Sequence, residues 1–89
     1  MRAIVTVTGK DKTGIIAGVS AALSECGVNI LDISQTVLQE YFAMIMLVDL
    51  AGSTVPFAAL SDTLSEAAKH LHMDIRVMRE EIFDAMHRV

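Results

Sequence analysis

An 89-residue chain can form one small domain, but not a catalytic domain joined to a regulatory one. Its net charge of −4, with scattered lysines and arginines, argues against nucleic acid as a partner, because a phosphate backbone is bound by clustered positive charge. The hydrophobic share of 53% is more than so small a domain can hide alone. We therefore expect a homo-oligomer, in the first place a dimer.

The cysteine content and the apolar runs bear on location. Cys26 is the single cysteine, so no internal disulfide can form, and we interpret it as a small buried residue at a helix end rather than a reactive thiol. The longest apolar run, residues 42–48, has the length of a strand and cannot span a membrane. We expect a cytoplasmic protein that does not contact a membrane.

The first half of the chain predicts a strand, a helix and a strand. Residues 3–8 alternate at strand spacing, and apolar residues then recur at helical spacing over residues 13–27, where a glycine ends the helix. Residues 28–38 follow as a strand whose apolar phase slips between Ile30 and Ile33. A β-bulge or a two-sided edge strand explains that slip.

The second half repeats the pattern. Residues 41–50 are apolar at both parities, which predicts a central strand covered on both faces. Pro56 lies in the first turn of a second helix, whose apolar stripe continues to Leu71. Residues 72–79 predict a last strand, and residues 80–89 can form a short helix.

The order strand, helix, strand, strand, helix, strand is one unit used twice. It predicts an α+β fold, the ferredoxin-like βαββαβ sandwich, in which a four-stranded antiparallel sheet carries both helices on one face. The first and third strands are then central, and the second and fourth are edges. An apolar outer sheet face and a long edge strand favour pairing between copies, with residues 30–37 at or beside the contact.

Several kinds of catalysis find no support in the sequence. Gly9 and Gly14 have the spacing of a phosphate loop, but isoleucines follow where that loop needs lysine and serine or threonine. The serines have no histidine partner in a readable arrangement. Acylphosphatases share the predicted fold and need an arginine in the first loop, which here holds Lys10 and Lys12. We expect no enzyme, with an acylphosphatase-type hydrolase as the least favoured alternative.

Metal and cofactor sites are not predicted either. His70 and His72 are two residues apart at a helix–strand junction, but a structural zinc ion needs four ligands and no cysteine or carboxylate accompanies them. Met44 and Met46 share a strand face, where methionine usually fills a core. We expect solvated histidines, core methionines, and neither metal nor cofactor.

The turn before the first helix fits a zwitterion. Backbone N–H groups from Thr13 to Ile16 can hold a carboxylate, because they lie at a helix start. The Asp11 and Asn29 side chains can accept hydrogen bonds from an ammonium, and Lys12 adds attraction for the acid. The alternative is that Asp11 or Thr13 simply caps the helix, that Asn29 marks a turn, and that no ligand binds.

The segments TGKDKTGIIAGVS (residues 8–20) and GVNILDISQT (residues 27–36) resemble the ACT domain family. They are similar in particular to the small stand-alone ACT proteins, to the halves of the glycine-cleavage transcriptional repressor and to the N-terminal domain of formyltetrahydrofolate deformylase. The resemblance extends to about Arg79, so residues 1–89 are expected to form one ACT domain with a possible helix at residues 81–89.

This resemblance implies a non-catalytic regulatory module that binds an amino acid or a similar small molecule between two copies. The first loop of one copy then faces the second strand of its neighbour. A ligand-free ACT module that scaffolds another protein is the alternative, since some ACT domains bind nothing. The implied ligand-binding residues are Asp11, Lys12, Thr13, Gly14, Ile15, Asn29, Ile30 and Leu31.

Overall fold

The computed structural model describes residues 1–87, and its elements follow the predicted order. The predicted tail helix is present, although residues 88–89 of that prediction lie outside the described residues. The strands are β1 (Arg2–Lys10), β2 (Asn29–Leu38), β3 (Tyr41–Asp49) and β4 (Asp74–Arg79), and the helices are α1 (Ile15–Glu25), α2 (Phe57–Leu71) and α3 (Glu80–Met86).

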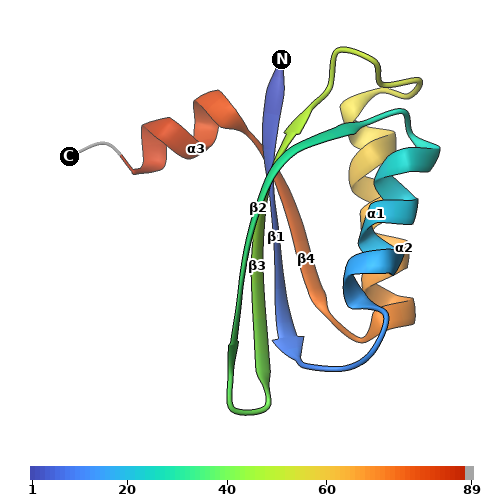
Figure 1. The fold of residues 1–89 in the computed structure, drawn as a ribbon. Coiled ribbons are helices and arrows are strands. Elements are labelled where there is room, and N and C mark those ends of the chain that lie inside the picture. The colour runs from blue at the N-terminus through green and yellow to red at the C-terminus, as the bar shows by residue number, and fades with distance from the viewer. Residues whose placement is uncertain (88–89) are drawn as a thin grey trace.

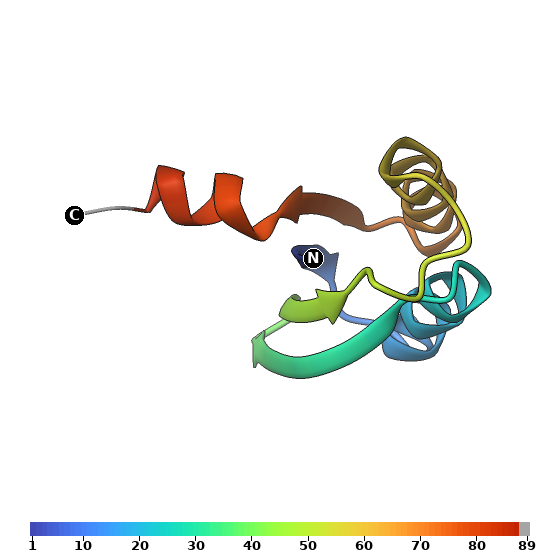
Figure 2. The ribbon, with the colours of Figure 1, turned by 90° about the horizontal axis from the view of Figure 1, so that it is seen from above.

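The sheet has the strand order β2-β3-β1-β4, and every neighbouring pair is antiparallel. The first and third strands are therefore central, and the second and fourth are edges, as predicted. Both α1 and α2 cover one face of the sheet, whereas α3 projects from the opposite side (Figures 1 and 2). This arrangement confirms the ferredoxin-like βαββαβ fold.

The core results from two periodicities. Every second residue of β1 and β3 points towards the helices, and helix residues three or four apart face the sheet. Burying one large apolar side chain contributes about 1.5–3 kcal/mol, so this layer holds the fold together. The side chains that are almost fully buried are Ala3, Val5, Val7, Val19, Leu23, Met44, Met46, Val48, Leu60 and Leu64.

The predicted cover on both faces of the third strand is wrong. β3 is central, but its burial alternates, and Tyr41 and Ile45 are 56% and 50% exposed on the side away from the helices. The cause is topological, because both helices pack on the same side of the sheet. They leave the outer sheet face bare, by which we mean the face opposite α1 and α2.

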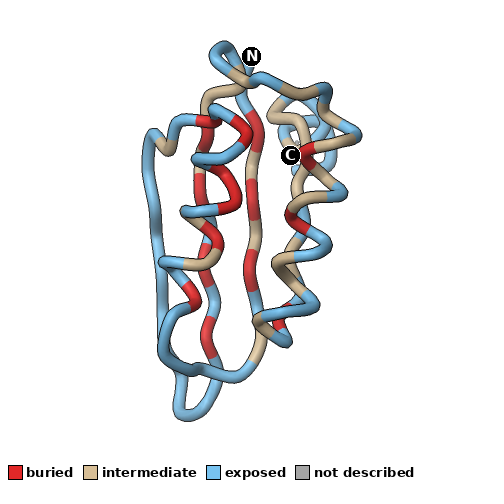
Figure 3. The backbone as a smooth tube through the Cα atoms, turned by 90° about the vertical axis from the view of Figure 1, so that its right-hand side faces the viewer, coloured by how far each residue is buried: buried red, intermediate tan, exposed pale blue. Residues whose placement is uncertain are grey.

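The predicted phase slip in the second strand is a β-bulge. The register between β2 and β3 shifts between Ile30 and Asp32. Residues 31–38, which follow, are exposed at every position, and the helical layer ends short of this strand (Figure 3). β2 is therefore an edge strand with two open faces, as its pattern predicted.

A left-handed glycine follows the end of α1, as predicted. Gly27 has φ +71°, and its N–H donates to the Ser24 carbonyl at 3.0 Å. The next N–H, of Val28, donates to the Leu23 carbonyl at 3.0 Å, which completes a two-bond helix cap. A Cβ on Gly27 would lie 2.6 Å from the Gly52 carbonyl oxygen, so the loop after β3 packs directly on this glycine.

The second helix differs from its prediction by one residue. Pro56 is the N-cap of α2 rather than part of its first turn, and the helix runs on to Leu71 as expected. Leu60 and Leu64 form the buried part of its stripe. No helix among residues 1–87 has the length and apolar composition that crossing a membrane requires.

Two glycine substitutions separate backbone strain from collision. Gly14, with φ +91°, has no atom within 4 Å of an added Cβ, so Gly14→Ala brings backbone strain alone and should cost about 1 kcal/mol. Gly27→Ala adds a collision with backbone, and we expect it to cost at least about 2 kcal/mol. Thermal unfolding of both variants checks this, and equal melting temperatures would contradict the packing at Gly27.

Candidate functional site

The loop between β1 and α1 leaves the start of the helix open. Gly14 is the N-cap, and no side chain among residues 1–87 caps α1, which rules out the expected alternative of a cap by Asp11 or Thr13. The first helical hydrogen bond runs from the Gly18 N–H to the Gly14 carbonyl at 2.9 Å. The N–H groups of the three preceding residues, 15–17, therefore have no partner within the described chain.

The loop itself is fixed to the end of the sheet where the hairpin joins β2 to β3. The Asp11 N–H donates to the Glu40 carbonyl at 2.7 Å, which ties the loop to the hairpin between β2 and β3. The Asp11, Lys12 and Thr13 residues are exposed, whereas Ile15 is buried in the core. The polar groups of the loop are thus available to a ligand, while the helix behind them is anchored.

A groove of about 340 Å³ runs between the start of α1 and β2. Its lining joins the charged residues of the loop to an apolar wall, and Gln35 is its polar residue on β2. The sequence prediction included Asp11, Lys12, Gly14 and Ile15, and the backbone N–H of Ile16, but missed the other residues of this lining. They are Ala17, Gln35, Val37 and Phe42.

The other half of the predicted site lies elsewhere in the same chain. Asn29 pairs with Asp49, whereas the loop follows Lys10, which pairs with Tyr41 at the hairpin end. About eight residues of strand, or roughly 26 Å, separate Asn29 from Val37 in the groove. One chain therefore does not bring Asn29, Ile30 and Leu31 to the loop.

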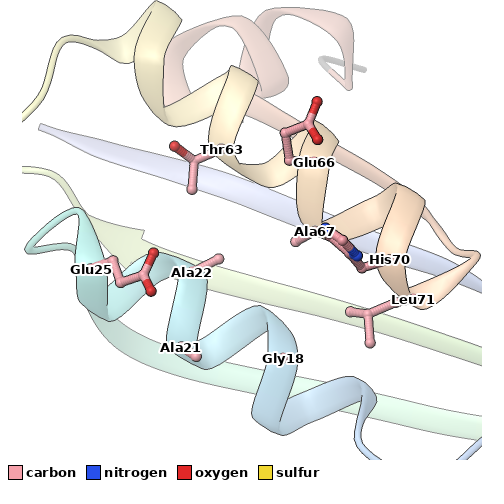
Figure 4. Close-up of a pocket in the computed structure, with 9 residues that line it drawn as sticks. All are labelled: Gly18, Ala21, Ala22, Glu25, Thr63, Glu66, Ala67, His70 and Leu71. Atoms are coloured by element: carbon pink, nitrogen blue, oxygen red, sulfur yellow. The ribbon is translucent and has the colours of Figure 1, made fainter.

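A second concavity, of about 530 Å³, lies between α1 and α2 (Figure 4). Small side chains, Gly18 and three alanines, form much of its lining. Glu66 is paired with Lys69 at 3.3 Å, and its carboxylate points away from α1. Among residues 1–87, no three His, Cys, Asp or Glu side chains gather closely enough to hold a metal ion. The polar residues of this concavity are Glu25, Thr63, Glu66 and His70, but no uncapped helix start of the described chain opens into it, as the start of α1 does into the groove beside β2.

The cysteine and the two histidines at the helix–strand junction lie as the sequence interpretation expected. Cys26 is buried, as expected for a residue at a helix end. His70 and His72 are exposed, and His72 is the C-cap of α2 with φ +55°. Neither histidine takes part in a hydrogen bond or ion pair found among the described side chains.

Comparisons with known proteins agree with the fold. The family model described as ACT domain matches residues 2–78. A UPF0237 protein of Clostridium acetobutylicum is 56% identical over 89 residues, which cover all of both chains. A UPF0237 protein of Methanocaldococcus jannaschii is 49% identical over 88 residues, 99% of this chain and 98% of the relative.

Solved structures give the same result. The ACT domain protein from Streptococcus pneumoniae superposes with a TM-score of 0.82 at 45% identity, with 98% of each chain covered. A formyltetrahydrofolate deformylase from Pseudomonas syringae shares the fold at TM-score 0.79 and 21% identity, over 88% of this chain and 27% of that one. A protein described as a glycine cleavage system transcriptional repressor does so at 0.72 and 22%, over 86% and 44%.

The chain belongs to the ACT domain family, as the two quoted segments indicated. Membership suggests a regulatory module that binds small ligands, and it points away from catalysis. The structures from the deformylase and the repressor confirm the predicted resemblance at the level of fold. The family model ends at residue 78, so α3 lies beyond it.

Proposed function

We propose that residues 1–89 form one ACT domain that acts as a non-catalytic regulatory module and binds an amino acid, or a similar small molecule, between two copies. The observation that carries this proposal is the uncapped start of α1, which opens into a groove beside an unpaired sheet edge. Unpartnered N–H groups at a helix start favour an anion. An unpaired, exposed β2 favours a second copy.

The groove provides groups for both ends of a zwitterion. The N–H groups at the start of α1 would hold the carboxylate, and Lys12 would add attraction. The Asp11 carboxylate would accept hydrogen bonds from the ammonium. Ile16 and Val37 offer an apolar wall to the remainder of the ligand.

A second copy would complete the site. Antiparallel pairing of two β2 strands about Ser34, near their centres, places Ser34 opposite its own counterpart. The β-bulge between Ile30 and Asp32 takes up one residue, so Ile30 of one copy then lies opposite Val37 of the other. Asn29 of that copy then lies opposite Leu38, beside the groove. The two separated halves of the predicted site meet in this arrangement, which joins the sheets into one.

The ligand-free scaffold remains the second candidate, because an exposed β2 edge favours pairing whether or not the groove is filled. A hydrolase of the acylphosphatase type gains nothing from the groove, whose lining includes Lys12 but no arginine. The two surviving candidates differ in one measurable respect. The regulatory module binds a small molecule that can be titrated, and the scaffold does not.

Calorimetry on site variants tests the proposed ligand contacts. A thermal-shift screen of the common amino acids first selects one that binds. Asp11→Asn and Asn29→Ala should each lower its affinity about tenfold to a hundredfold, because a charge-assisted hydrogen bond is worth roughly 1.5–3 kcal/mol. Lys12→Ala should matter less, since an exposed lysine is screened and mobile.

Asp62→Asn is the matched control for this series, because Asp62 is exposed on α2, away from the groove. It should bind like the wild type. Equal affinity in Asp11→Asn, Asn29→Ala and the control would place the site elsewhere. Failure of every amino acid to bind would favour the scaffold.

Sedimentation tests the β2 edge. The wild type at micromolar concentration should sediment at no less than twice the 9.6 kDa of one chain. Ile33→Lys places two lysines beside the proposed axis, and the like charges should halve the sedimenting mass. Ile33 is half-exposed in the single chain, so folding should persist. A wild type at 9.6 kDa, or an unchanged mass in Ile33→Lys, would contradict edge pairing.

A further inference from the structure

The outer sheet face has an uncharged centre with a projection and a hollow. The strand register places Ile45 between Thr6 and Ser34, and Ala43 between two threonines in the next row. These side chains border a depression of about 260 Å³. Ile45 is half-exposed and stands at the border of this depression. The projecting side chain of Ile45 and the hollow over the small Ala43 thus lie two residues apart on β3.

Charged side chains of the four strands surround this centre, and their charges cancel; three further carboxylates lie on α3, at one end of the face. Of the strand residues, three are basic and three are acidic, whereas the whole chain carries −4. A face with no net charge complements a copy of itself better than a strongly acidic or basic partner. The six residues are Arg2, Lys10, Asp32, Asp49, Asp74 and Arg76.

The helix α3 lies on the same side of the sheet, where no other helix among residues 1–87 packs against it (Figures 1 and 2). None of its seven residues is buried, and Ile82 and Met86 are at least half-exposed. An ion pair of 2.7 Å between Arg2 and Glu80 fixes its first residue to β1. A helix this short is not stable alone in water. Its length of about 10 Å equals the usual spacing of two stacked sheets.

The face is large enough for a stable contact. Four strands of six to ten residues span at most roughly 19 by 33 Å, or about 600 Å² before the relief of the side chains is added. A standard interface buries about 800 Å² per partner, so this relief and one side of α3 would have to add about 200 Å². The chain also exposes 5620 Å², where a folded protein of its mass exposes about 5,100 Å².

We propose that a second copy of this chain stacks its outer sheet face on the first, about a two-fold axis that crosses β3 at Met44 at right angles to the strands. This axis places Ile45 of each copy over the hollow at Ala43 of the other. It also places Arg76 of each copy over Asp74 of the other. The α3 helix of each copy borders one end of the contact.

This surface is separate from the β2 edge, so the two contacts can form together and can be broken one at a time. The test therefore uses Ile33→Lys, in which edge pairing is blocked. Ile33→Lys should still sediment as a pair of 9.6 kDa chains. Adding Ile45→Asp should reduce the mass to 9.6 kDa, because two carboxylates would enter an uncharged contact. Ile45→Thr, the matched control, should keep the pair.

Circular dichroism confirms that each variant is folded before it is sedimented. A single-chain mass for Ile33→Lys alone would overturn the stacked contact and leave edge pairing intact. If the double variant, Ile33→Lys with Ile45→Asp, still sediments as a pair, the stacked contact is also overturned. If Ile33→Lys changes nothing but Ile45→Asp halves the wild-type mass, stacking holds and edge pairing fails.

A charge exchange tests the axis. In the Ile33→Lys background, Arg76→Asp should weaken the pair at least tenfold, since under the proposed axis it puts a carboxylate over Asp74 of the other copy and also removes the 3.3 Å ion pair of Arg76 with Asp74 of its own chain. Adding Asp74→Arg should restore the pair, because opposite charges then face each other again. Weakening without restoration would overturn the axis through Met44.

Discussion

The helical layer is narrower than the sheet that it covers, and the exposed surfaces of this protein follow from that constraint. Both crossover helices pack on one face, so β1 and β3 bury one set of side chains and expose the other. The layer also ends short of β2, which stays exposed from Leu31 to Leu38. The proposed ligand site and the proposed contacts between copies lie where this cover is missing.

The sequence was sufficient to predict those features of the fold that depend on a local pattern of residues. Alternation over residues 3–8, the glycine after α1 and the phase slip near Ile30 predicted a strand, a helix cap and a β-bulge, and all three are present. The sideways position of α1 over the sheet depends on packing between distant segments. For that reason Gln35 and Val37 were missed in the groove, and cover on the outer face of β3 was wrongly expected.

A site shared between copies has a thermodynamic consequence. If each copy supplies part of the ligand's contacts, the ligand must strengthen association by the same factor by which association strengthens binding of the ligand. A change in ligand concentration then becomes a change in assembly without any rearrangement inside one chain. Such coupling would give a domain of 89 residues, with no catalytic centre proposed, a means of regulation.

The most direct test of the shared site is complementation between two weak binders. Asp11→Asn and Asn29→Ala are mixed in equal amounts, allowed to exchange copies and titrated with an amino acid that binds the wild type. In a mixed pair one site carries both changes and the other carries neither, so about a quarter of all sites should regain wild-type affinity. A mixture that binds no better than its two components would contradict a site built from Asp11 of one copy and Asn29 of the other.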